Sequence, residues 1–235
     1  MNRFAILILL FASCATPWLV AQQSGAAIDR PAEPNFVFDD DGGKVQTVPK
    51  EEPTAASPTP KKYHGGAMMK SVQQVSIFLG SRWAEGGVRA REAGLSDLLA
   101  NNSSSSNSSA LNDLQSYQIK AFRAAPSVDD FSVLSTVNDL AIQHKLVELL
   151  ANKSIPAPND STVYVVYLAP GVNSTIGGSK GGVDYLAYHN IVHVAAGALR
   201  YVVVPFDADA ATHRAAAARA YAETAENPNG IDGLY

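Results

Sequence analysis

The chain has 235 residues, of which 46% are hydrophobic, and it carries a formal net charge of −4 with a pI near 5.7. Its lysines and arginines are scattered rather than clustered in one segment, which argues against nucleic acid as a partner. No stretch approaches the roughly 20 apolar residues that a membrane-spanning helix needs, so we expect no transmembrane segment in the mature chain.

The first residues have the pattern of a secretory signal peptide. Residues 1–3 supply a short basic start, residues 4–12 form an uninterrupted apolar run, and Leu19-Val20-Ala21 is suited to cleavage. The sequence therefore predicts a signal peptide over residues 1–21. We expect the mature protein to be secreted or periplasmic, in a bacterium.

The only cysteine offers an alternative at this end of the chain. Cys14 closes the run Leu10-Phe11-Ala12-Ser13-Cys14, which loosely matches a bacterial lipoprotein box. Lipidation at Cys14 would replace cleavage after Ala21, although the apolar residues after Cys14 are more typical of a continuing signal. Cleavage after Ala21 would leave a mature chain without a thiol or a disulfide.

Residues 22–62 differ in composition from the rest of the chain. They contain six prolines among charged residues, serines and threonines, with few aromatic residues and little periodicity. Such a segment buries too little apolar surface to offset the entropy lost on ordering. We therefore predict a disordered, proline-rich linker over residues 22–62 and one globular domain over residues 63–235.

The predicted domain alternates strands and helices. Alternating and β-branched runs are typical of strands, and apolar residues three and four positions apart are typical of helices. The pattern predicts an α/β (α+β) fold with a twisted mixed sheet packed against helices. In chain order we expect a strand over 72–80, helices on both sides of the serine-rich tract 101–109, a helix over 127–152 with Ser127 as its cap, strands at 162–168 and 201–205, and a helix over 213–225 capped by Thr212.

Two histidines, His189 and His193, are four residues apart. On a helix they would lie on one face and could bind zinc together. In a strand they would also share a face, but they would lie about 13 Å apart, too far to share a metal ion. His213 and Glu223 are the candidates for a third ligand. We predict no cofactor, with zinc as the alternative.

The last predicted helix contains Arg219-Ala220-Tyr221-Ala222-Glu223, which has the spacing of a zinc-peptidase motif, His-Glu-x-x-(His or Glu). In that motif the residues at i and i+4 bind the metal and the Glu at i+1 activates water. Here Arg219 and Ala220 replace the first His and the catalytic Glu. Because arginine keeps its proton, we predict a vestigial motif in which Arg219 pairs with Glu223 or another carboxylate. The alternative is that Arg219 and Glu223 form an ordinary solvent-facing ion pair on an alanine-rich helix and that the site does not derive from a metal site.

The segment Arg219 to Pro228 resembles the Ser-His-Glu-x-Ala-Glu-x-x-x-Asp-Pro pattern of secreted proteins related to the plant EXORDIUM (phosphate-induced) family and their bacterial counterparts. The likeness extends to the start at residues 63–69, to residues 155–178, and to residues 187–189 and 201–205. The resemblance implies a zincin-like domain whose last helix carries the site. With a degenerate His-Glu-x-x-Glu motif, it also implies the loss of peptidase activity.

Three hypotheses for the function remain open. The favoured one is an exported, catalytically inactive metallopeptidase-like domain that binds an extracellular or envelope partner. The second is an active metal-dependent hydrolase with ligands from His189, His193, His213 and Glu223, which would need a new general base. The third is a structural or carbohydrate-contacting envelope module. The sequence leans against an enzyme without deciding the question.

Overall fold

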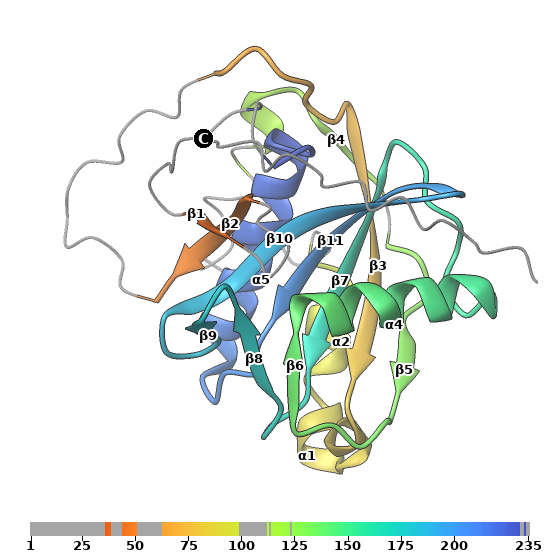
Figure 1. The fold of residues 1–235 in the computed structure, drawn as a ribbon, viewed down its shortest axis with the longest axis vertical. Helices are drawn as coiled ribbons and strands as arrows, with labels where there is room; N and C mark the ends of the chain where they lie inside the picture. The colour runs from red at the N-terminus through yellow and green to blue at the C-terminus, as the bar shows by residue number, and fades with distance from the viewer. Residues whose placement is uncertain are drawn as a thin grey trace, which may run out of the picture. The chain divides into compact units, whose positions relative to one another are not determined.

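The computed structural model describes residues 36–38, 44–50, 63–98, 112, 114–122, 124–230 and 233. These residues form a mixed sheet with helices packed on it (Figure 1), which confirms the predicted α/β class. The predicted signal peptide over 1–21, with Cys14, and the serine-rich tract 101–109 lie outside the described residues.

The main sheet has a parallel half and an antiparallel half. Strands β11, β7 and β3 are parallel neighbours, whereas β1, β2, β10 and β11 pair antiparallel. The order of strands is β1 (Phe36–Phe38), β2 (Lys44–Pro49), β10 (Tyr185–Val194), β11 (Gly197–Val204), β7 (Thr162–Leu168), β3 (Ser71–Leu79) and β4 (Lys120–Ala121), and β5 (Val128–Asp130) also pairs with β3. The three predicted strands of the core, at 72–80, 162–168 and 201–205, therefore lie side by side.

Strand β7 is the centre of the core. Every residue of its sequence TVYVVYL is buried, because β11 and β3 flank it and both faces of the sheet are covered. Tyr167 is fully buried, and its ring stacks on Phe78 at a centroid distance of 5.1 Å. Burial of each such aromatic side chain contributes about 2 to 3 kcal/mol.

A smaller sheet contains β6 (Thr136–Asn138), β8 (Asn173–Ile176) and β9 (Ser179–Lys180). Strands β8 and β9 are joined by Gly177 and Gly178, which both have positive φ angles, 52° and 84°. A two-residue hairpin turn of this kind favours glycine at both positions. Gly177 and Gly178 therefore form the tight turn of a β-hairpin.

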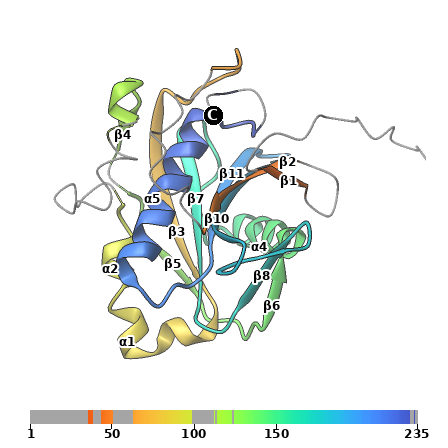
Figure 2. The same cartoon turned by 90° about the vertical axis from the view of Figure 1, so that its left-hand side faces the viewer.

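The two long helices cover opposite faces of the main sheet. Figure 2 shows α4 (Asp139–Ala151) on one side and α5 (Ala210–Glu226) on the other. The short helices η1 (Ser81–Ala84), α1 (Gly86–Arg89) and α2 (Glu92–Leu95) follow β3, and α2 packs against α5 (Figure 2). The site helix α5 is thus held between the sheet and α2.

Helix α4 begins later than its sequence predicts. The expected helix over 127–152, capped by Ser127, is wrong in its first half, where the chain forms β5 and β6. The cap is Asn138, whose side chain accepts a hydrogen bond from the N–H of Ala141 at 2.9 Å. Apolar residues upstream of Asn138 continue the helical spacing by coincidence, and Phe131 among them is largely exposed.

A buried carboxylate holds the start of α4 on the sheet. Asp139 accepts hydrogen bonds from the hydroxyl of Tyr201 (2.8 Å) and from the side-chain amides of Gln143 (2.8 Å) and Asn190 (3.0 Å). Burial raises the pKa of Asp139, and these hydrogen bonds oppose that effect. The network ties α4 to β10 and β11.

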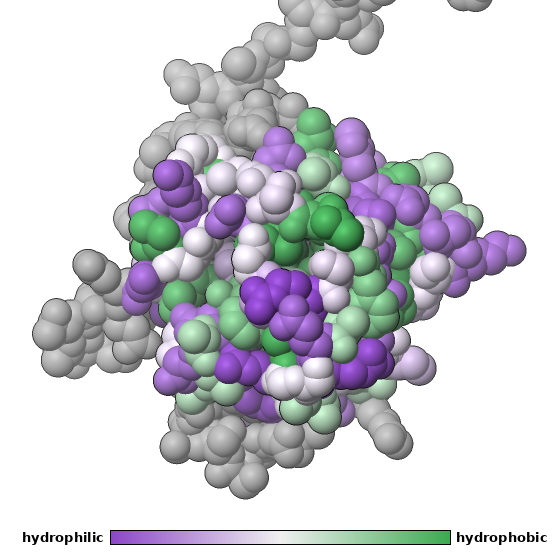
Figure 3. Space-filling model, turned by 90° about the horizontal axis from the view of Figure 1, so that it is seen from below, coloured by the Kyte–Doolittle hydropathy of each residue, from purple (hydrophilic) through white to green (hydrophobic). Residues whose placement is uncertain are grey.

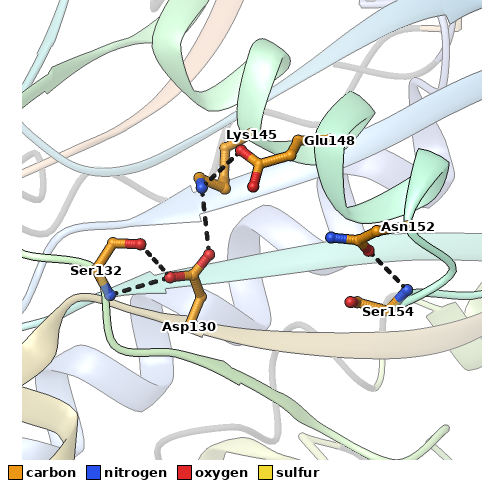
Figure 4. Close-up of polar contacts among 6 residues, drawn as sticks. All are labelled: Asp130, Ser132, Lys145, Glu148, Asn152 and Ser154. Carbon is orange, nitrogen blue, oxygen red and sulfur yellow. Dashed lines mark hydrogen bonds and ion pairs between the residues drawn. The ribbon is translucent and has the colours of Figure 1, made fainter.

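Further along α4, Lys145 links the helix to β5. Its ammonium group lies 3.4 Å from Asp130 at the end of β5 and 2.8 Å from Glu148 on the next turn of α4 (Figure 4). Asp130 also accepts hydrogen bonds from the backbone and hydroxyl of Ser132. These contacts hold α4 against β5. This strand lies where the sequence predicted the first part of a longer helix.

The predicted linker over 22–62 and the predicted domain start at 63 need correction. Within the described part of that segment, β2 pairs with β10, and Val45 and Val48 are buried in the core. All four residues from Val45 to Val48 are buried, which a composition average over 22–62 conceals. Among the described residues, no helix is long and apolar enough to cross a membrane.

Candidate functional site

Helix α5 carries the residues of the predicted vestigial motif, Arg219, Ala220 and Glu223, and it starts before the predicted position. The cap is Asp209 rather than Thr212, because its carboxylate accepts hydrogen bonds from the N–H groups of Ala211 (2.7 Å) and Thr212 (2.9 Å). The helix runs from Ala210 to Glu226 and is rich in alanine, the best helix former. It ends just before Pro228.

One face of α5 packs on the sheet. Ala217, Ala220, Tyr221 and Thr224 recur at three- and four-residue spacing and are buried against the strands. The alanines let the helix backbone approach β10 and β11 closely. Ala220, in the position of the catalytic Glu of the motif, has 0% exposure and therefore faces the core.

Arg219 and Glu223 form the predicted ion pair. The Nε of Arg219 donates to Oε1 of Glu223 at 2.9 Å, and the side chains are 42% and 6% exposed, respectively. An exposed pair at this spacing contributes a few tenths of a kcal/mol. Glu223 is buried, so its carboxylate has lost much of its hydration, and Arg219 partly compensates for that loss. Removal of Arg219 should therefore destabilise the protein more than the removal of one partner of an exposed pair.

The structure separates the two candidate histidines of β10. His189 and His193 lie in one strand, so their four-residue spacing corresponds to about 13 Å. His189 is buried and donates from Nε2 to Oε1 of Gln46 at 3.0 Å, and Gln46 also accepts from the amide of Asn227 at 3.1 Å. His193 is exposed. His189 therefore joins β10, β2 and the end of α5.

The other two candidate ligands also lie apart. His213 and Glu223 are both on α5, ten positions from each other, which corresponds to about 15 Å along the helix axis. Over the part of the chain that the structure describes, no three His, Cys, Asp or Glu side chains gather as a metal site. The geometry thus does not bring His189, His193, His213 and Glu223 together.

A cavity of about 260 Å³ opens beside Arg219, between α5 and the β2–β10 edge of the sheet. Its polar lining residues are Lys50, Thr212 and Arg219, and the rest of the lining is apolar side chains of β2, β10 and α5. The Nζ of Lys50 also donates to the carbonyl of Gly182 at 2.8 Å. Two cations and a hydroxyl over an apolar wall suit an anionic ligand with an apolar part.

Sequence reasoning missed Lys50 because it treated residues 22–62 as a linker. The pairing of β2 with β10 is what brings Lys50 beside Arg219. The β-branched residues Val45, Thr47 and Val48 were the available signal, but their run is too short to stand out among the surrounding prolines.

Searches against family models, curated proteins and solved structures give no match to this chain. The resemblance to EXORDIUM-related proteins and to zincin-like domains therefore stays a prediction.

Proposed function

We infer that the chain is an exported, peptidase-like domain that binds a ligand at α5 without hydrolysing it. The ion pair between Arg219 and Glu223 is the observation that carries this inference. A guanidinium stays protonated at accessible pH and cannot act as a metal ligand. Arg219, at the position of the first metal ligand, therefore carries a fixed positive charge. This charge pairs with the carboxylate of Glu223, at the position of the second ligand.

The position of Ala220 supports the same function. A hydrolytic centre of this type needs a carboxylate at i+1 to activate water. Ala220 has no such group and is packed in the core. The export and envelope association remain part of the proposal, and they rest on the predicted signal peptide.

The cavity beside Arg219 is the binding site in this proposal. Arg219 and Lys50 would bind a carboxylate or another anion, and the apolar lining would cover an attached hydrocarbon or aromatic group. The active metal hydrolase is less favoured because its four candidate ligands lie apart. The carbohydrate-contacting module is less favoured because six of the tyrosines that would support it are fully buried, namely Tyr164, Tyr167, Tyr185, Tyr188, Tyr201 and Tyr221.

Metal analysis of the purified protein, combined with a peptide-cleavage assay, tests the absence of hydrolysis. We expect zinc well below one ion per chain, and no cleavage that a chelator suppresses. Stoichiometric zinc together with chelator-sensitive cleavage would overturn the proposal.

Titration with benzoate, an anion attached to an apolar ring, tests the binding site. We expect the Arg219→Gln variant to bind benzoate about tenfold more weakly, the order expected for one charge-assisted hydrogen bond. Arg82→Gln is the matched control, since Arg82 also pairs with a nearby glutamate, Glu85 three residues further on, but is not among the residues that line the cavity. Equal losses of benzoate affinity in both variants would show that binding depends on the overall charge of the protein and not on Arg219 in particular.

A further inference from the structure

A second cavity lies on the other side of α5, between its first turns and α2. It is partly open, has a volume of about 270 Å³ and is lined by Ala90, Arg91, Gly94, Leu95, Ala210, His213 and Arg214. On the face seen from below in Figure 3, strongly hydrophilic residues gather at the centre and hydrophobic ones border them. At about 30 Å³ for each water-sized group, the cavity holds on the order of nine non-hydrogen atoms.

His213 contributes a polar group that the protein does not satisfy. Its side chain is 1% exposed, and neither Nδ1 nor Nε2 has a hydrogen-bond partner. The ring has an edge contact with Tyr167 and a tilted contact with Phe206, at centroid distances of 6.0 and 5.5 Å. A buried polar group without a partner destabilises the protein, so a ligand that completes its hydrogen bonds gains affinity.

The charged residues of the cavity wall are both cations. Arg91 is held over the ring of Phe206 at 4.8 Å, and its two terminal nitrogens donate to the carbonyls of Asp207 (2.7 Å) and Ala208 (2.6 Å). Each terminal nitrogen has a further N–H, and Nε–H remains as well. Arg214 donates to the carbonyl of Leu98 at 3.2 Å. No carboxylate is among the lining residues, which favours an anion over a metal ion or an amine.

The N-terminus of α5 is not the source of this preference for an anion. The first N–H groups of α5, those of Ala211 and Thr212, already donate to Asp209. The guanidinium groups of Arg91 and Arg214 therefore provide the anion-binding charge, and His213 provides the selectivity.

We propose that this cavity binds a small 2-hydroxycarboxylate, with its carboxylate on the guanidinium groups and its hydroxyl on the ring of His213. A planar guanidinium matches a carboxylate. A neutral imidazole has one nitrogen that donates and one that accepts, and a hydroxyl can complete either of them. Ala90, Ala210 and Leu95 line the rest of the cavity and provide an apolar contact for the methyl group of such a ligand.

Calorimetric titration of the purified protein with L-lactate and with propionate tests the proposal, because the two ligands differ by one hydroxyl group. We expect lactate to bind about tenfold more tightly, the order expected for one hydrogen bond to a buried group. His213→Phe should bring lactate to the affinity of propionate, whereas Arg82→Gln should leave both affinities unchanged.

A second variant covers the case in which His213→Phe fails to fold. Gly94→Leu places a side chain in the cavity, and a Cβ there meets only Arg214 Nη1, at an ordinary 3.5 Å. Leucine is also a better helix former than glycine, so this variant should fold and lose lactate binding. The matched control is Gly87→Leu on α1, where a Cβ has no neighbour within 4 Å, and it should bind lactate normally.

Three results would overturn the proposal: undetectable lactate binding by the folded protein, equal affinity for lactate and propionate, or undiminished lactate binding by Gly94→Leu.

Discussion

At the scale of single residues, His213 has the most unusual environment among the candidate residues. Burial lowers its pKa from 6.5 to about 4, and the positive charge of Arg91 acts in the same direction. The imidazole is therefore neutral near pH 7 and fits a role in hydrogen bonding. Sequence reasoning singled out His213 as a metal-ligand candidate, but the cations beside it disfavour a metal ion.

The lowered pKa of His213 predicts a loss of stability in mild acid. Between pH 6.5 and 4 the unfolded chain binds a proton at this histidine and the folded chain does not, so stability falls as the pH falls. The loss approaches about 3 kcal/mol when the pH reaches 4. Urea unfolding of the protein and of His213→Phe at pH 7.5, 5.5 and 4.5 measures it, and the variant should lose less stability over this range.

The exposed His193 provides the control, because its replacement in a His193→Gln variant should preserve the acid-induced loss. Parallel stability curves for the protein and for His213→Phe would contradict the assigned neutral state.

At the scale of elements, α5 has different surroundings on its two sides. The face with Ala217 and Ala220 packs on the sheet, whereas Arg219 points to the cavity at the β2–β10 edge. The predicted vestigial motif therefore has residues on both faces. Its i and i+4 positions carry the ion pair, and its i+1 position belongs to the core.

This division predicts that simple restoration of the catalytic carboxylate damages the fold. In Ala220→Glu a charged side chain replaces a methyl group at 0% exposure, which adds desolvation to overpacking. We expect a loss of about 3 kcal/mol or more in the free energy of unfolding, measured by urea denaturation. Ala211→Glu on the exposed first turn should change it by less than about 0.5 kcal/mol. A stable Ala220→Glu variant would mean that this face of α5 is not fixed against the sheet.

The helices and strands show which features are readable from the sequence. The β-branched run 162–168 and the Arg219–Glu223 spacing predicted β7 and the ion pair correctly, because both patterns are local. The start of α4 was mispredicted because the apolar spacing of a helix also occurs across β5 and β6, and Asn138 decides where the helix begins. The cavity of Arg91, His213 and Arg214 was not predictable, since its residues meet only through the packing of α2 on α5.

At the scale of the whole molecule, a strand that is distant in sequence from its neighbour β10 completes the structure. Strand β2 covers the edge of β10, and Gln46 on β2 contacts both His189 on β10 and Asn227 at the end of α5. The same strand leads to Lys50 at the cavity beside Arg219. Residues before position 63 therefore contribute to both the core and the proposed ligand site.

This contribution predicts different behaviour for two truncated chains, one that begins at residue 36 and one that begins at residue 63. The shorter chain lacks Val45 and Val48, each worth about 1.5 to 3 kcal/mol of burial, and it leaves the backbone of β10 without its partner strand. We expect its unfolding midpoint in urea to be clearly lower than that of the chain from residue 36, and its elution in size-exclusion chromatography to show association through the exposed edge. Benzoate binding should also weaken in the shorter chain, because Lys50 is missing. If both chains unfold at the same midpoint and remain monomeric, the pairing of β2 with β10 does not stabilise the fold, which would contradict this prediction.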